Sequence, residues 1–80
     1  MWKPLSNPVL IHEEGLLRKI IYEDNFKHET RFKIIRVRNS FFMAQQISYD
    51  NTPCKDEQQI IDIYSINHIH NLDFQIWIEE

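Results

Sequence analysis

Segment 72–78 (LDFQIWI) carries an apolar side chain at every second position. Successive side chains of a β-strand point to opposite faces, so this period of two predicts a strand with one buried face. Positions 72, 74, 76 and 78 would face a core, while Asp73, Gln75 and Trp77 would face outward. A chain of 80 residues makes one small domain, so the rest of the chain must supply a matching β surface.

Residues 30–38 (TRFKIIRVR) form the clearest strand pattern of the first half. The apolar phase slips at Ile34-Ile35, which predicts a β-bulge there. Asn39-Ser40 reads as a tight turn, and residues 41–49 return as the partner strand, with positions 41, 43, 47 and 49 on one face. Before them, Pro4 and Pro8 bracket an extended N-terminal arm over residues 1–8, and a short strand is expected at 9–11, followed by a turn at 13–15.

Two segments fit a strand or a helix. Residues 16–24 alternate as a strand but also place apolar residues in a helical stripe, and residues 53–64 begin like a helix but contain three β-branched isoleucines. We favour strands in both, and a turn or short 3₁₀ segment at 65–71. The resulting fold is mainly β: a small antiparallel barrel or strongly bent sheet of about five to six strands. SH3-like and Sm-like barrels have this size, as an analogy of fold only. The alternative is α+β, with one helix on a four-stranded sheet.

The composition indicates the cellular compartment of the protein and the kind of genome that encodes it. Isoleucine occurs 13 times, whereas alanine and glycine occur once each, a skew that AT-rich codons produce and that suggests a low-GC bacterium, a phage or a mobile element. Cys54 is the only cysteine, so an internal disulfide is excluded. No signal-peptide pattern is visible, and the longest apolar run, 41–44, is far shorter than the ~20 residues of a membrane span. We therefore expect a cytoplasmic protein without a membrane partner.

Residues suited to catalysis are poorly placed in the sequence. Cys54 lies among acidic residues, which suppress the thiolate, and the paired carboxylates fall at predicted turns or at residues 79–80. Gly15 alone cannot build a phosphate-binding loop. His68 and His70 form an H-x-H pair that would share one face of a strand, and they are weak candidates for metal ligands because no structural-zinc spacing accompanies them. We expect a protein that is not an enzyme and binds no cofactor.

A basic cluster indicates nucleic-acid binding as one hypothesis. Five residues within a short span make up the cluster: Lys27, Arg31, Lys33, Arg36 and Arg38. Tyr22, Phe41 and Phe42 are close in sequence and suited to stacking on bases of RNA or single-stranded DNA. The net charge of −3 opposes this hypothesis, because phosphate affinity depends on uncompensated cations. The charge is also uneven, with eight basic and five acidic residues in 1–49 against one and seven in 50–80.

Binding to a larger protein is the leading hypothesis. Trp77 would face outward on a terminal, edge-like strand, and Trp2 lies in the N-terminal arm; tryptophan is prominent in interface energetics. Asp56, Glu57 and Asp73 would add an acidic contribution that could imitate phosphates. The specific form that we favour is a phage- or mobile-element-encoded inhibitor of a host nucleic-acid enzyme or defence system. A self-complementary edge would also form a homodimer, and the alternative for Trp77 is packing under the arm against Trp2.

Overall fold

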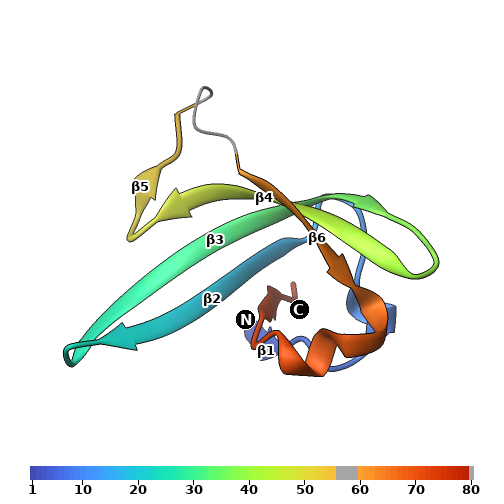
Figure 1. Cartoon of the computed structure of the whole chain (residues 1–80), viewed down its shortest axis with the longest axis horizontal. Coiled ribbons are helices and arrows are strands. Elements are labelled where there is room, and N and C mark those ends of the chain that lie inside the picture. The colour runs from blue at the N-terminus through green and yellow to red at the C-terminus, as the bar shows by residue number, and fades with distance from the viewer. Residues whose placement is uncertain (56–59, 80) are drawn as a thin grey trace.

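The computed structural model describes residues 1–55 and 60–79, which fold into one bent antiparallel sheet (Figure 1). The strand order is β1-β7-β2-β3-β4-β5. The strand β6 lies outside this order: it pairs with the same edge of β4 as β5 does, but at the opposite end of β4. The strands are β1 (Trp2–Pro4), β2 (Leu16–Glu23), β3 (Phe26–Val37), β4 (Phe41–Tyr49), β5 (Thr52–Pro53), β6 (Ile61–Ser65) and β7 (Gln75–Trp77). Two 3₁₀ segments, η1 (Pro8–Leu10) and η3 (Ile66–Asn71), complete the described elements.

The expected strongly bent sheet is confirmed, but the sheet does not close into a barrel. β1 lies at one edge and β5 and β6 lie at the other, and these edges do not pair within the described residues. The α+β alternative is wrong, because residues 16–23 pair with β3 over the whole length of β2 and residues 61–65 pair with β4. The β-branched isoleucines of both segments fit a pleated surface better than a helix.

The predicted bulge in the long strand β3 is confirmed. Ile34 pairs with Ala44 and Arg36 pairs with Met43, so Ile35 has no partner. A second irregularity lies on β4, where the register passes over Ile47. The face expected for residues 41–49 was wrong: positions 42 and 44 are buried, because they lie opposite the inward-facing residues Val37 and Ile34 on either side of the bulge in β3.

Two hairpins end in the same kind of turn. Asp24 and Asn25 between β2 and β3 have φ values of 50° and 69°, and Asp50 and Asn51 between β4 and β5 have 46° and 65°. Positive φ at both central residues is the pattern of a type I′ turn, which Asp and Asn tolerate and which matches the twist of hairpin strands. These turns set the register of both hairpins.

The N-terminal segment departs from expectation in one place. Residues 8–10 form η1 instead of a strand, because Pro8 suits the first helical position and the Asn7 side chain accepts a hydrogen bond from the Val9 N–H at 3.0 Å. The preceding arm is extended, as predicted, but it forms β1 and pairs with β7. β7 is therefore an inner strand, and the expectation that it forms an exposed edge was wrong.

The C-terminal alternation is confirmed, although the regular strand is short. Phe74 and Ile76 are buried, while Trp77 faces outward. Asp73 adopts a φ of 57°, so the chain turns there between η3 and β7. The predicted 3₁₀ segment is confirmed as η3, which covers one side of the core with Ile69.

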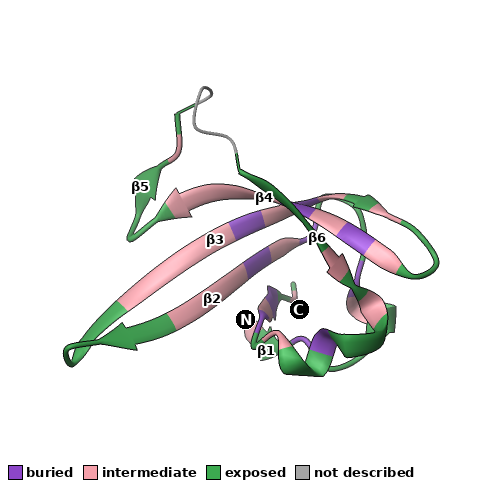
Figure 2. Ribbon diagram, viewed as in Figure 1, coloured by how far each residue is buried: buried purple, intermediate pink, exposed green. Residues whose placement is uncertain are grey.

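The core lies between the inner face of the sheet and the segments around η3 and β1 (Figure 2). Its most buried large side chains are Phe42, Leu17, Ile34 and Ile76. The Tyr64 and Phe74 rings meet edge to face with centroids 5.0 Å apart, and Phe42 lies 5.5 Å from Tyr64. Within the described residues, no helix has the length and apolar character needed to cross a membrane.

Gly15→Ala is expected to destabilise the protein by about 1–2 kcal/mol, because it overpacks a close approach. A Cβ atom at this position would lie 3.0 Å from the His12 carbonyl oxygen and 3.2 Å from the Ile34 side chain. The backbone cannot move aside easily, since Gly15 accepts a hydrogen bond from the Ile34 N–H at 2.8 Å. Urea unfolding followed by circular dichroism measures the effect. An unchanged midpoint would show that the 12–15 turn adapts to the added methyl group.

Candidate functional site

The outer face of the sheet, opposite the core, carries a group of large planar side chains. Leu17, Phe32 and Ile76 point into the core, so their neighbours along each strand point outward. The register places Arg18 between Gln75 on β7 and Arg31 on β3, and Trp2 opposite Trp77. We call this group the arginine–tryptophan cluster; its members are Trp2, Arg18, Glu29, Arg31, Gln75 and Trp77.

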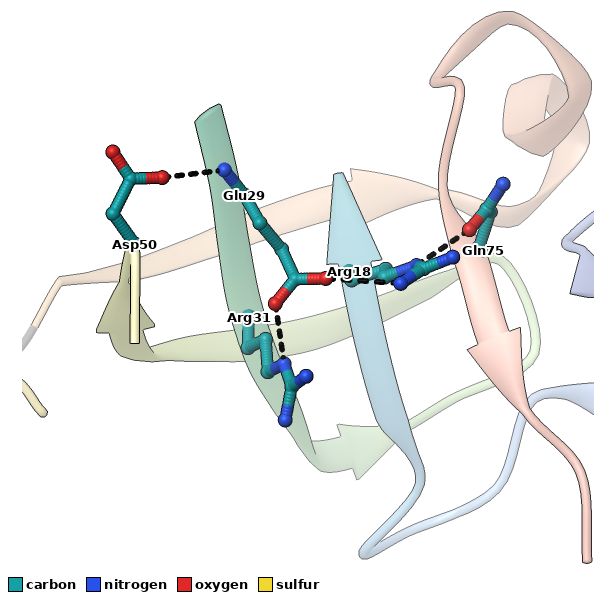
Figure 3. Close-up of polar contacts among 5 residues, drawn as sticks. All are labelled: Arg18, Glu29, Arg31, Asp50 and Gln75. Atoms are coloured by element: carbon teal, nitrogen blue, oxygen red, sulfur yellow. Dashed lines mark hydrogen bonds and ion pairs between the residues drawn. The ribbon is translucent and has the colours of Figure 1, made fainter. Parts of the chain in front are cut away.

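Glu29 holds both arginines of the cluster (Figure 3). Its Oε2 accepts a hydrogen bond from Arg18 Nη1 at 3.0 Å, and its Oε1 accepts one from Arg31 Nε at 2.7 Å. Arg18 Nε donates to Gln75 Oε1 at 2.6 Å. The side chains of Arg18 and Glu29 are only 19% and 15% exposed, so this network is shielded from solvent screening more than a surface ion pair.

The pKa of Glu29 lies below its ordinary value of 4.5. Burial acts to raise it, but the hydrogen bonds and positive charges of Arg31 and Arg18 outweigh burial. The carboxylate is therefore ionised at neutral pH, and it offsets one of the two arginine charges. The cluster consequently has a fixed arrangement of hydrogen bonds with a small local positive charge.

Trp2 links the arginines to Trp77. The guanidinium carbons of Arg18 and Arg31 lie 4.6 Å and 5.6 Å from the centroid of the Trp2 ring, within cation–π range. The Trp2 and Trp77 rings meet edge to face with centroids 5.4 Å apart and an angle of 72°. Trp77 remains 40% exposed. The alternative expectation, that Trp77 packs against Trp2, is therefore confirmed, and the Trp77 indole is still partly open to solvent.

An open hollow of about 530 Å³ lies beside Trp77. It is lined by His12, Glu14, Gly15, Leu16, Trp77, Ile78 and Glu79. The hollow and the Trp77 indole form one continuous surface. Most of this surface comes from β2, β7 and the 12–15 turn, all of which are anchored in the sheet.

A second polar contact set joins the β4–β5 turn to β3. Asp50 Oδ1 accepts a hydrogen bond from the Glu29 backbone N–H, and Asp50 Oδ2 pairs with His28 Nδ1, both at 2.7 Å. The His28 ring stacks on Tyr49 with centroids 5.8 Å apart. The contacts with His28 and the Glu29 N–H lower the pKa of Asp50 below its ordinary value, against a small opposing effect of burial. The hydrogen bond to Asp50 fixes the backbone of Glu29, whose side chain belongs to the cluster.

The predicted basic residues fall on one face, but two of them are paired with acids. By register, Lys27, Arg31, Lys33 and Arg36 all project from the outer face of β3, and Arg38 follows the end of that strand. Arg31 is paired with Glu29, and Lys33 Nζ lies 3.6 Å from Glu14 Oε2. Lys27 and Arg36 are exposed.

The remaining candidates are scattered. Asp73 lies at the turn before β7, and Asp56 and Glu57 lie outside the described residues. His68 and His70 belong to η3, the expected 3₁₀ segment, so the strand geometry that would align this H-x-H pair on one face is not formed. In residues 1–55 and 60–79, no group of three or more His, Cys, Asp or Glu side chains is arranged to hold a metal ion.

None of Arg18, Glu29 and Gln75 was chosen as a candidate site residue from the sequence. The signal that could have found this network is the hairpin turn at Asp24-Asn25. A two-residue turn pairs Glu23 with Phe26, and counting outward along both strands then pairs Arg18 with Arg31. Gln75 joins through β7, whose pairing with β2 links distant parts of the chain.

No family model, no curated protein and no solved structure matches the chain.

Proposed function

We propose that this chain is a protein-binding module that docks a larger partner through the arginine–tryptophan cluster. The observation that carries the proposal is the partly exposed Trp77 indole, supported by Trp2, which is itself stacked on two arginines held by Glu29. Tryptophan and arginine are the residue types most enriched at binding hot spots. A surface whose side chains are already ordered loses little conformational entropy when a partner binds.

The ion pairs favour a protein partner over a nucleic acid. Phosphate binding requires cations that release counterions from the nucleic acid. Arg18 and Arg31 share the carboxylate of Glu29, and Lys33 faces Glu14, so their charges are partly neutralised within the protein. The aromatic surface at Trp77 offers the same contact area whether or not these charges are paired. It suits an apolar side chain of a protein that also offers hydrogen-bond acceptors to the arginines.

The specific form that we propose is inhibition of a host nucleic-acid enzyme or defence system by a phage- or mobile-element-encoded protein. This form is supported by composition: the isoleucine-rich skew and the six-charge acidic excess of residues 50–80, seven acidic against one basic. An acidic surface can imitate the phosphates that such an enzyme binds. Asp62 lies on β6, Asp50 in the β4–β5 turn and Asp73 in the turn before β7. Because these carboxylates are dispersed, we take the cluster as the primary docking surface.

Trp77→Ala is expected to weaken partner binding about tenfold or more, because it removes the central aromatic contact. The tagged wild-type chain is used to capture a partner from host extract, and the affinity of the purified partner is then measured by calorimetry. Phe26→Ala is the matched control, because Phe26 is also an exposed aromatic residue but lies at the tip of the β2–β3 hairpin. Equal affinity of the Trp77 variant and wild type, or no captured partner, would contradict the proposal.

The second candidate function is binding of RNA or single-stranded DNA, and one observation favours it. The register of β3 aligns Lys27, Arg31, Lys33 and Arg36 on the outer face, next to Tyr22 of β2. Fluorescence anisotropy with labelled oligonucleotides over a salt series tests it. Binding that weakens with salt and is reduced in Lys27→Ala and Arg36→Ala would support this function, and an absence of binding at low salt would eliminate it.

A further inference from the structure

The strand β6 has one free edge. Within the described residues it pairs only with β4. The Gln46 N–H donates to the Ile60 carbonyl at 2.9 Å, and the Ile66 N–H donates to the Ser40 carbonyl at 3.0 Å. Hydrogen-bonded pairs alternate along an antiparallel ladder, so the backbone groups at positions 60, 62, 64 and 66 point to β4. Those at positions 61, 63 and 65 point away from the sheet.

This free edge is also apolar. Ile61 and Ile63 are 44% and 65% exposed, and both project from the outer face, opposite Gln45 and Met43. Natural edge strands are usually protected from pairing by lysine, proline or a bulge. β1, at the other edge of the sheet, carries Lys3 and Pro4. The described β6 sequence, IDIYS, contains neither residue type, and its register with β4 is regular.

We propose that a second copy of this chain pairs with the free edge of β6, antiparallel, on a two-fold axis at Ile63. Ile63 then forms a hydrogen-bonded pair with Ile63 of the second copy, and Ile61 pairs with Ser65 in both directions. The intervening pair brings Asp62 opposite Tyr64, so no two like charges face each other. The isoleucines of both copies join into one apolar strip on the outer face.

The charge of Asp62 selects this register. The neighbouring two-fold arrangement that uses the same outward backbone groups is centred on Asp62, and it would set two carboxylates directly opposite each other. Like charges in directly opposite positions destabilise a strand pair. A two-fold axis at Tyr64 would use the same outward groups, but it would pair Asp62 with Ile66, which already belongs to η3. Only the axis at Ile63, the middle residue of β6, pairs all five residues of the strand with one another, and this self-complementarity points to a second copy as the occupant. The arginine–tryptophan cluster lies on β1, β7, β2 and β3, so this pairing is independent of the proposed function.

The first test compares two lysine variants by sedimentation equilibrium over a concentration series. The wild-type chain is expected to show a monomer–dimer equilibrium. Ile63→Lys sets two lysines opposite each other on the axis, and we expect its dimer to dissociate at least tenfold more readily. Ile61→Lys is the matched control, since its lysines lie four residues apart along the strand, about 13 Å. A monomer at all concentrations, or equal effects of the two variants, would overturn the proposal.

The second test reads the register by cross-linking. Cys54 is replaced by serine, and a single cysteine is introduced as Ile63→Cys or Ile61→Cys. A short bismaleimide is expected to link the two copies through position 63 and not through position 61, because only position 63 lies opposite itself. Preferential linking at position 61, or equal yields at both, would overturn the two-fold axis at Ile63. Circular dichroism of each variant shows that these exposed positions leave the fold intact.

Discussion

Phe42→Ala is expected to destabilise the protein by about 3–5 kcal/mol, enough to unfold much of the population of so small a domain. The Phe42 side chain is fully buried and contacts the rings of Tyr64 and Phe74. Its removal leaves a cavity at the point where β4, β6 and β7 meet. Urea unfolding followed by circular dichroism measures the loss, and the free energy of unfolding should fall without a change in the denatured-state baseline.

Phe26→Ala serves as the control for this prediction. It removes the same side chain from the same sheet, but at a position that is 71% exposed near the β2–β3 turn. We expect a change within about 0.5 kcal/mol. Comparable losses for the two variants would mean that the core does not lie around Phe42.

Glu29→Ala is expected to destabilise the protein by about 1.5–3 kcal/mol at pH 7. The variant leaves Arg18 and Arg31 directly opposite each other on neighbouring strands without the carboxylate between them. The two like charges then repel, and Arg18, which is only 19% exposed, loses a charged hydrogen-bond partner. Glu23→Ala removes an exposed carboxylate from the end of the same hairpin and should change stability little. A similar loss in both variants would contradict the role of Glu29.

The pH dependence gives an independent reading of Glu29. Its folded-state pKa is lower than its ordinary value of 4.5, so the unfolded chain binds this proton first as pH falls. The stabilisation is thus complete above about pH 4.5 and is lost as pH falls through the folded-state pKa. Glu29→Gln cannot titrate, and we expect its stability to fall less steeply below pH 4.5 than that of wild type. Parallel curves would show that Glu29 does not contribute. Asp50, whose pKa is also lowered, adds to the slope of both proteins.

The sequence patterns predicted the positions of the strands better than they predicted which side chains of each strand face the core. Alternation over residues 72–78 and 30–38 predicted the buried positions of Phe74 and Ile76 and the bulge at Ile35, because one-face burial imposes a period of two. The face of residues 41–49 was assigned wrongly, because an irregularity at Ile47 and the bulge opposite shift which positions face the core. Such shifts depend on the partner strand, which local alternation does not describe.

The candidate site was predicted only in part, because it depends on distant pairing. Trp2 and Trp77 were recognised as candidates, and their contact was anticipated as an alternative. The position of Glu29 between Arg18 and Arg31 follows from the hairpin register, whereas the contact with Gln75 needs β7 to lie beside β2. Local propensity also missed η1, where a proline and an asparagine cap outweighed the apolar run at 9–11.

The pairing of β1 with β7 has a consequence for the order of assembly during synthesis. The three hairpins built from residues 16–53 are local and can close as soon as they leave the ribosome. Trp2, by contrast, must wait for Trp77, its partner across almost the whole chain. Contacts of such long sequence separation form slowly. The arginine–tryptophan cluster should therefore form after the rest of the sheet, and a nascent chain carrying the complete β2–β4 scaffold would still lack the proposed docking surface.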